Sequence, residues 1–336
     1  MYNSKISGLG YFVPENIVTN DDLSKIIDTN DEWIQERTGI QERRHVVKGS
    51  GETTSTMALK ASKIAIERSG ISKEDIDFIV FATISPDYYF PGPGVTLQRD
   101  LEIKTIGALD IRNQCSGFIY ALSVADQYIK TGMYKNILIV GAELQSLGID
   151  ISTRGRNVAV IFGDGAGAAI ISREEDLSKG ILSTHLHSEG EHALELAVES
   201  PGMGGKWITD ILKENNPEDV SYFPYMNGQF VFKHAVTRFA EVINEGLEAN
   251  NLNVSDIDML IPHQANLRIS QFIQKKFNLR DDQVFNNIQK YGNTTAASIP
   301  IALTEAWELG KIKSGDTVVL AAFGSGFTWA SAIIKW

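Results

Sequence analysis

The sequence contains few of the residues that build cross-links, linkers or membrane segments. Its 336 residues include one cysteine and nine prolines. The single cysteine, Cys115, excludes an intrachain disulfide and any zinc site that needs several cysteines. The longest strictly apolar runs, such as Val318 to Phe323, fall far short of the roughly 18 residues that span a bilayer, and no signal-like apolar segment follows Met1. We therefore expect a cytoplasmic protein without a membrane segment.

Positive charge is also scarce. Lysine and arginine number 31 against 42 aspartates and glutamates, which gives a formal net charge of −11. A negative net charge opposes binding of nucleic acid over a broad face. A polyanionic partner would therefore need a local basic patch. The hydrophobic fraction of 43% is typical of a soluble globular protein, and the length suggests two domains or a duplicated fold.

Internal similarity supplies a boundary that no low-complexity stretch or proline-rich linker marks. A helix pattern over about 54–68 leads into the apolar run after Asp75, and a second such pattern leads into the run after Asp256, 181 residues later. Helix patterns that end at Lys130 and Lys313 lead into the apolar runs 137–140 and 317–321 at nearly the same offset. The two matches predict a duplication with halves 1–175 and 176–336.

Each half alternates helix patterns with short, continuous apolar runs. Runs without polar alternation are typical of strands that are covered on both faces, so we expect an α/β protein with mostly parallel sheets. Ligands of such folds bind beyond the carboxyl ends of strands. The residues that directly follow the apolar runs are therefore the main candidates for function.

Three such residues lie at expected strand-to-helix turns. Cys115 precedes a helix pattern, whose macrodipole and free N–H groups favour a thiolate nucleophile; the alternative is a buried structural cysteine. His263 follows the run 259–262 and, taken alone, fits a hydrogen-bonded loop or core histidine. Asn293 follows Gly292 and, taken alone, fits a helix N-cap. Because the duplication brings these turns towards one crevice, we expect the three side chains to form one site.

Two further patterns are weaker. The segment from Gly163 to Ala168 fits the dinucleotide pattern G-x-G-x-x-A, but an expected short strand follows it instead of a helix, so we interpret it as a tight hairpin. A metal site could be inferred from three nearby histidines, His185, His187 and His192. No adjoining cluster supplies the further ligands that a metal ion needs. We interpret these histidines as part of a polar loop.

Seven motifs run nearly from end to end: Asp31–Ile34, Glu36–Ile40, Cys115–Phe118, Phe162–Gly167, His263–Arg268, Gly292–Thr294 and Phe323–Trp329. Together they resemble the beta-ketoacyl-acyl carrier protein synthase III enzymes of the thiolase superfamily. The resemblance implies a five-layered αβαβα fold of two similar halves, an obligate homodimer, and an acyltransferase of fatty acid biosynthesis that uses no cofactor or metal.

The resemblance also implies a catalytic scheme. Cys115 would take the acyl group from an acyl-CoA, and the backbone N–H groups of Cys115 and Ser325 would form the oxyanion hole. Malonyl-acyl carrier protein would then lose carbon dioxide and attack the acyl group. His263 and Asn293 would donate hydrogen bonds to the malonyl thioester oxygen as it gains negative charge.

Binding residues follow from the same resemblance. Trp33 and Arg156 would sandwich the CoA adenine, with Arg37 near the phosphates. The pantetheine tunnel would be lined by Gln229, Phe232 and Asn266. The acyl pocket would include Phe323, and Phe90 would reach across the dimer to the other subunit's pocket.

A cationic helix face would receive the carrier protein. Arg268 and Lys275 lie seven residues apart on an expected helix, with Lys276 adjacent. The ordinary interpretation is a solvated face. An acidic carrier that approaches an enzyme of net charge −11 nevertheless needs such a patch.

The chain departs from the family pattern near the expected acyl site. Arg112-Asn113-Gln114 replaces small apolar residues, Gln229 replaces asparagine, and Ser325 replaces glycine. The segment from Glu191 to Tyr225, which contains Gly202, Gly204 and Gly205, is longer than in typical members and could form a movable lid. These departures favour an acyl donor longer or more functionalised than acetyl.

Several alternatives remain. Thiolases use a second cysteine and elongating ketoacyl synthases a second histidine after the first, and both are missing here. A CoA-dependent, type III polyketide-synthase-like condensing enzyme is the nearest rival, although its proline-containing glycine loop is absent. Rivals from other classes are an NAD-dependent oxidoreductase that uses 163–168 and a non-catalytic acyl-binding partner, against which the intact Cys115, His263 and Asn293 argue.

Overall fold

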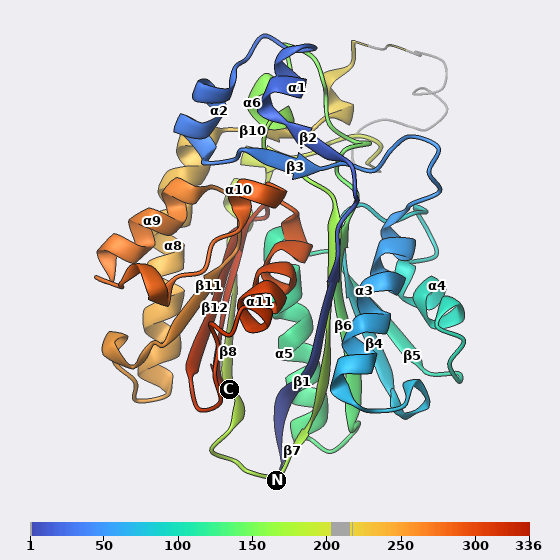
Figure 1. Cartoon of the computed structure of the whole chain (residues 1–336), viewed down its shortest axis with the longest axis vertical. Helices are drawn as coiled ribbons and strands as arrows, with labels where there is room; N and C mark the ends of the chain where they lie inside the picture. Colours follow the sequence, from blue (N-terminus) through green and yellow to red (C-terminus); the bar gives the residue numbers. More distant parts are fainter. Residues whose placement is uncertain (1, 203–215, 217) are drawn as a thin grey trace.

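Two β-sheets of related topology form the framework of the protein (Figure 1). The computed structural model describes residues 2–202, 216 and 218–336. The first sheet has the order β1-β7-β6-β4-β5 and consists of β1 (Asn3–Phe12), β4 (Phe78–Ala82), β5 (Gly107–Ile111), β6 (Asn136–Glu143) and β7 (Gly165–Glu174). The second has the order β11-β12-β13-β8 and consists of β8 (Gly180–Ser188), β11 (Met259–Pro262), β12 (Thr317–Gly324) and β13 (Thr328–Lys335).

Both sheets are mixed, so the expectation of mostly parallel sheets is wrong. β4 runs parallel to β5 and β6, and β11 runs parallel to β12, whereas β7 and β13 are antiparallel to both of their neighbours. Strands that are covered on both faces are continuously apolar in either direction. An apolar run therefore predicts burial but does not report strand direction.

Helices form three layers around the two sheets (Figure 1). The outer face of the first sheet is covered by α3 (Thr54–Ser69) and α4 (Pro93–Asp100), and the outer face of the second by α8 (Gly228–Ala249) and α9 (Leu267–Lys276). Between the sheets lie α5 (Gly117–Lys130) and α11 (Ser298–Glu308). This arrangement confirms the expected αβαβα fold.

The two central helices are largely buried. In α11 every residue from Ser298 to Ala306 is buried, and α5 buries Phe118, Leu122 and Ile129 against strands of both sheets. A helix that is apolar on all sides is stable only inside a protein, and each large side chain buried there contributes about 1.5–3 kcal/mol. The amino ends of both helices are thereby fixed in place.

The duplication extends to the turns before equivalent strands. Short 3₁₀ helices, η1 (Lys73–Asp75) and η5 (Val254–Asp256), precede β4 and β11. In each, the aspartate side chain accepts a hydrogen bond from the backbone N–H three residues earlier, at 3.2 Å for Asp75 and 2.7 Å for Asp256. The equivalent strands thus begin from the same kind of cap.

Smaller elements cover one end of the sheets, at the top of Figure 1. They include α1 (Asn20–Ser24), α2 (Asp31–Thr38), α6 (Arg156–Ala159), α10 (Ile288–Tyr291), and the strand pairs β2 (Ile17–Thr19) with β3 (Glu42–Arg44) and β9 (Leu196–Ala197) with β10 (Tyr225–Met226). The remaining 3₁₀ helices are η2 (Gln114–Ser116), η3 (Gly190–Glu195), η4 (Val220–Tyr222), η6 (Asp281–Gln283) and η7 (Thr295–Ala297).

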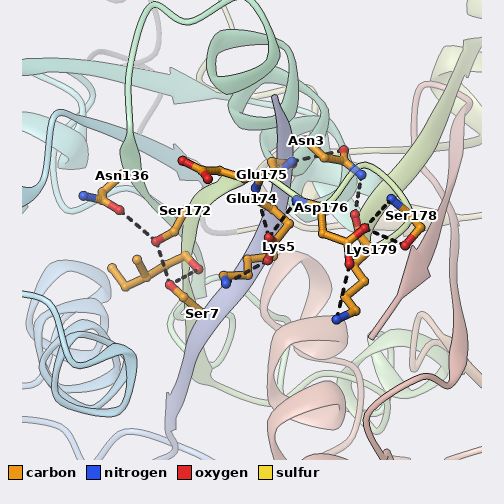
Figure 2. Close-up of polar contacts among 12 residues, drawn as sticks. Asn3, Lys5, Ser7, Asn136, Ser172, Glu174, Glu175, Asp176, Ser178 and Lys179 are labelled. Carbon is orange, nitrogen blue, oxygen red and sulfur yellow. Dashed lines mark hydrogen bonds and ion pairs between the residues drawn. The ribbon is translucent and has the colours of Figure 1, made fainter. Parts of the chain in front are cut away.

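The opposite end holds the connection between the sheets. Lys5 on β1 pairs with Glu174 at the end of β7 at 2.8 Å, and the side chain of Asn3 donates to the carbonyl of Lys179 in the turn that leads to β8 (Figure 2). Among the described residues, no helix has the length and apolar character needed to cross a bilayer.

Two local expectations are wrong. The run before Gly163 is helical at α6, so the segment 163–168 is no hairpin; it enters β7 at Gly165. His185 and His187 lie on β8 instead of a loop and both contact the carboxylate of Glu245 on α8, the latter at 2.6 Å. Strand residues two apart share one face, which explains why both reach the same helix. The described residues include no group of metal-binding side chains.

Candidate active site

Cys115 lies in the 3₁₀ turn η2, directly before α5. Its side chain is 7% exposed and packs against the end of β12. A Cβ atom placed on Gly324 would lie 2.6 Å from Cβ and 2.9 Å from Sγ of Cys115, so only glycine allows this close approach. The nucleophile candidate is therefore held between the start of α5 and a strand of the second sheet.

The surroundings of Cys115 oppose its ionisation. Burial raises the pKa of the thiol to about 12, and the negative charge of Glu143 acts in the same direction. Hydrogen bonds from the backbone N–H groups of Cys115 and Ser325 favour the thiolate, but burial outweighs them. Burial and the charge of Glu143 thus act against the thiolate that the place of Cys115 before a helix was expected to favour. The same two N–H groups are those expected to form an oxyanion hole.

His263 follows β11, where its backbone N–H donates to the carbonyl of Ala321 on β12 at 2.8 Å. Ring atom Nδ1 lies 2.6 Å from Ser298 Oγ at the start of α11. Ring atom Nε2 is buried and has no hydrogen-bond partner among the residues described. Burial lowers the pKa of His263 to about 3, so the ring is neutral at physiological pH.

Asn293 is held by main-chain contacts with the glycine motif of the first sheet. Its N–H donates to Ile161 at 2.9 Å, and its carbonyl accepts from the N–H of Gly163 at 3.1 Å. Its side-chain Oδ1 accepts from the N–H of Thr295 at 2.8 Å, which directs the amide Nδ2 elsewhere. A Cβ on Gly163 would lie 2.2 Å from the carbonyl oxygen of Tyr291. The glycine motif thus packs against protein backbone, as a dinucleotide loop would not.

The three candidates come together around the amino ends of the central helices. Gly117, two residues after Cys115, lies next to Ala296, since a Cβ on the glycine would be 3.6 Å from that of the alanine. Ser298, which contacts His263, is two residues after Ala296, and Asn293 is three residues before it. The expectation that these residues lie close together agrees with this geometry, but Asn293 follows the short helix α10 and Gly292, so its expected place at a strand-to-helix turn is wrong.

Trp33, Arg37 and Arg156 also meet, on the elements that cover this end of the sheets. The guanidinium carbon of Arg37 lies 4.6 Å from the centre of the Trp33 ring, and that of Arg156 lies 5.1 Å from it. Arg156 also donates to the carbonyl of Asp28 at 2.8 Å. Two cations therefore lie close to one aromatic ring on α2, and Trp33, Arg37 and Arg156 form the Trp33 cluster.

The expected tunnel residues have different surroundings. Asn266 caps α9 through its Oδ1 and donates from Nδ2 to the Arg37 carbonyl at 2.9 Å. Phe232 is half-buried on α8, with its ring 5.8 Å from the guanidinium carbon of Arg268. Gln229 is exposed in the first turn of α8. Asn266 thus connects the Trp33 cluster to α9, and Phe232 contacts α9 from α8.

The expected docking residues are exposed on α9. Arg268, Lys275 and Lys276 form no ion pair with the residues that the structure describes, and Phe272, 44% exposed, lies one turn after Arg268. This face of α9 therefore combines cations with an apolar side chain.

The two aromatic residues expected at the acyl pocket lie in contrasting places. Phe323 is 4% exposed on β12, with its ring 4.9 Å from that of Phe327. Phe90 is 81% exposed, next to the exposed Tyr88 and Tyr89. Of the glycines expected to form a lid, Gly204 and Gly205 lie outside the described residues.

The sequence analysis missed a buried carboxylate beside the site. Glu143 ends β6, is fully buried, and accepts a hydrogen bond from Ser85 Oγ at 2.6 Å. Burial raises its pKa to about 7. Glu143 comes directly after an apolar run, as His263 does. The same position in the sequence could therefore have marked Glu143 as a candidate functional residue.

The fold, in which the segments that carry Cys115, His263 and Asn293 meet, is that of the thiolase-fold condensing enzymes, which are acyltransferases. The chain matches the family described as 3-oxoacyl-[acyl-carrier-protein] synthase III over residues 109–190 and its C-terminal counterpart over 247–336. It belongs to the beta-ketoacyl-[acyl-carrier-protein] synthase III family. Its reaction is therefore a condensation of fatty acid biosynthesis.

Similarity to individual members covers nearly the whole chain. The chain is 45% identical over 334 residues to beta-ketoacyl-[acyl-carrier-protein] synthase III of Pseudoalteromonas atlantica, with 99% of this chain and 100% of the relative covered. The relative from Sulfurimonas denitrificans is 46% identical over 327 residues, with coverages of 97% and 96%. The crystal structure of 3-oxoacyl-[acyl-carrier-protein] synthase III from Aquifex aeolicus superposes with a TM-score of 0.90 at 41% identity, covering 99% and 100%.

Proposed function

We propose that Cys115 carries the acyl group through the reaction. Its sulfur attacks the thioester carbon of an acyl-CoA, the bond to the CoA sulfur breaks, and the thiol proton leaves with CoA as its free thiol. The N–H groups of Cys115 and Ser325 hold the oxyanion that forms during the attack. The observation that carries the proposal is that two N–H groups converge on the only thiol of the chain, close to the segments that position His263 and Asn293.

His263 and Asn293 act in the second half-reaction in this proposal. Malonyl-acyl carrier protein loses carbon dioxide, and the electron pair stays on the thioester as an enolate whose carbon attacks the acyl group and releases Cys115. The hydroxyl of Ser298 already accepts from the N–H of Gln264 at 3.4 Å, so its proton is available for His263 Nδ1. The neutral ring then carries its own proton on Nε2, which donates to the enolate oxygen together with Asn293 Nδ2.

The Trp33 cluster is the proposed contact for the nucleotide of CoA. A planar adenine can stack on Trp33 and the guanidinium group of Arg156, and Arg37 supplies charge for the phosphates. Asn266, Phe232 and Gln229 line the path of pantetheine from this cluster towards Cys115. The exposed cations of α9, with Phe272 between them, receive the acidic carrier protein.

The proposed enzyme acts as a homodimer. Phe90 is too exposed to belong to the acyl pocket of its own chain. In a dimer, Phe90 of the partner subunit closes the acyl pocket beside Phe323. The proposed halves 1–175 and 176–336 then divide the chemistry, because the first supplies Cys115 and the second supplies His263 and Asn293.

Separate measurement of the half-reactions tests this assignment. Cys115→Ser should lose acyl transfer from acyl-CoA while it stays folded. His263→Ala and Asn293→Ala should keep most of the acylation but slow malonyl decarboxylation by about 10²- to 10³-fold, since each removes one donor to the developing charge. His185→Ala is the matched histidine control, because His185 lies on β8 and contacts Glu245. An acyl adduct on another residue of Cys115→Ser, or slow acylation with normal decarboxylation in the other variants, would contradict the assignment.

A further inference from the structure

Asn293 depends on an unusual backbone turn for its orientation. The N–H that fixes its Oδ1 belongs to Thr295, which has a φ of +49°. This left-handed conformation is unfavourable for a β-branched residue and persists only where neighbouring groups enforce it. Thr295 is 1% exposed, so those neighbours are protein groups.

The end of β6 supplies such groups. Gln145, just past β6, donates from Nε2 to the hydroxyl of Thr295 at 3.1 Å. The same Nε2 lies 3.3 Å from the carboxylate of Glu143, which also accepts from the backbone N–H of Ala296. The side chains of Glu143 and Gln145, at the end of β6, therefore form hydrogen bonds with two consecutive residues of the turn, Ala296 and Thr295.

Gln145 is itself firmly placed. Its backbone N–H donates to Asp164 Oδ1 at 2.7 Å, and its residue is 8% exposed. A Cβ on Gly141 would lie 2.3 Å from the carbonyl oxygen of Ala296, so β6 and the turn are in direct contact. The glutamine amide has little freedom to leave Thr295.

We propose that Gln145 is a positioning residue for the condensation step: it holds Thr295 in its left-handed conformation, and Thr295 in turn orients the Asn293 amide towards the substrate. The inference rests on the proposed role of Asn293. Glu143 supports it by accepting from Gln145 Nε2 and from the turn. Neither Gln145 nor Thr295 has to touch the reacting atoms.

Two variants remove the contact from opposite sides. Gln145→Leu keeps a similar volume but loses the donor, and Thr295→Val keeps the β-branched shape but loses the hydroxyl. Each should slow malonyl decarboxylation by about 10- to 100-fold, less than loss of the Asn293 amide, because a misplaced donor still contributes. Self-acylation of Cys115 should stay within about twofold. Thr295→Ser, which keeps the hydroxyl, should restore most of the decarboxylation rate.

Controls separate positioning from general damage. Gln283→Leu alters an equally buried glutamine, 6% exposed, that binds the carbonyl of Ile257 away from this turn, and it should leave both half-reactions unchanged. In an Asn293→Ala background, Gln145→Leu should have no further effect, because the group it positions is gone.

The outcomes distinguish the two proposals. If Asn293→Ala slows decarboxylation whereas Gln145→Leu and Thr295→Val do not, the positioning role is wrong and the role of Asn293 stands. If Asn293→Ala itself leaves decarboxylation intact, the proposed function of Asn293 fails first. Equal losses in both half-reactions for Gln145→Leu and Thr295→Val would indicate damage to the whole site and would also overturn the inference.

Discussion

The rate at which iodoacetamide alkylates Cys115 should rise steadily with pH and show no plateau below about pH 10. Only the thiolate reacts, and burial together with the charge of Glu143 raises the pKa of this thiol from its ordinary value to about 12. At pH 8 the thiolate fraction is then about 10⁻⁴, against about 10⁻¹ for an unperturbed thiol, a difference of about 10³-fold. The rate should increase about tenfold for each pH unit from 7 to 10.

Mass spectrometry of the intact protein measures this rate without ambiguity, because Cys115 is the only thiol of the chain. The urea-unfolded chain is the control and should show the profile of an ordinary thiol. Restricted access of iodoacetamide to Cys115 lowers the alkylation rate of the folded protein by the same factor at every pH. The slope of the rate against pH, and not the absolute rate, therefore reports the pKa of the thiol. A plateau near pH 8 in the folded protein would refute the reasoning.

Glu143→Gln extends the same experiment. The carboxylate raises the pKa of the Cys115 thiol, so the uncharged amide should lower that pKa and accelerate alkylation above pH 7. Because the pKa of Glu143 is itself raised to about 7, its charge is lost on acidification, and the two proteins should converge below that pH. Identical profiles above pH 8 would mean that the carboxylate does not act on the thiol.

Three further predictions follow from the site. Gly324→Ala should abolish acylation, since its new Cβ would lie 2.6 Å from Cβ of Cys115; an active, folded variant would show that the strand end can move aside. Charge reversal at Arg268 and Lys275 should raise the apparent KM for malonyl-carrier protein in a salt-dependent way but leave acyl-CoA loading unchanged, and equal losses with malonyl-pantetheine would instead indicate a damaged site. Competition between acetyl-, medium-chain and branched acyl-CoA should show a higher kcat/KM for a non-acetyl donor, as the polar residues from Arg112 before Cys115 suggest. A clear preference for acetyl-CoA would instead indicate an enzyme that initiates ordinary fatty acid synthesis.

The sequence predicted those features that depend on short segments. Helix periodicity, continuous apolar runs and a constant offset between the halves were sufficient for the α/β class and the duplication. The position of His263 after the apolar run 259–262 and of Cys115 before a helix pattern made these two residues candidates, whereas Asn293 was expected at a strand-to-helix turn and instead follows the short helix α10. The helix periodicity and the apolar runs are local and can each be read within about twenty residues, whereas the duplication required a comparison of segments about 180 residues apart.

Features that depend on contacts between distant segments could not be predicted in this way. The neutral state of the Cys115 thiol results from burial against Gly324 and from the charge of Glu143, neither of which is adjacent in sequence. The support that Gln145 gives Thr295 joins residues 150 positions apart. Strand direction was also missed, because a run buried on both faces has the same composition in parallel and antiparallel sheets.

The packing of Cys115 against Gly324 has a consequence for biosynthesis. A ribosome adds about 5–20 residues per second, so it makes roughly 200 further residues, over about 10–40 s, before the strand that covers the thiol exists. During that interval the nascent first half lacks both the backbone N–H of Ser325 that hydrogen-bonds to the sulfur and the strand end at Gly324 that packs against it. The thiol of an incomplete chain is therefore an ordinary, more acidic thiol that is open to oxidants and electrophiles, and completion of the chain buries and protects it.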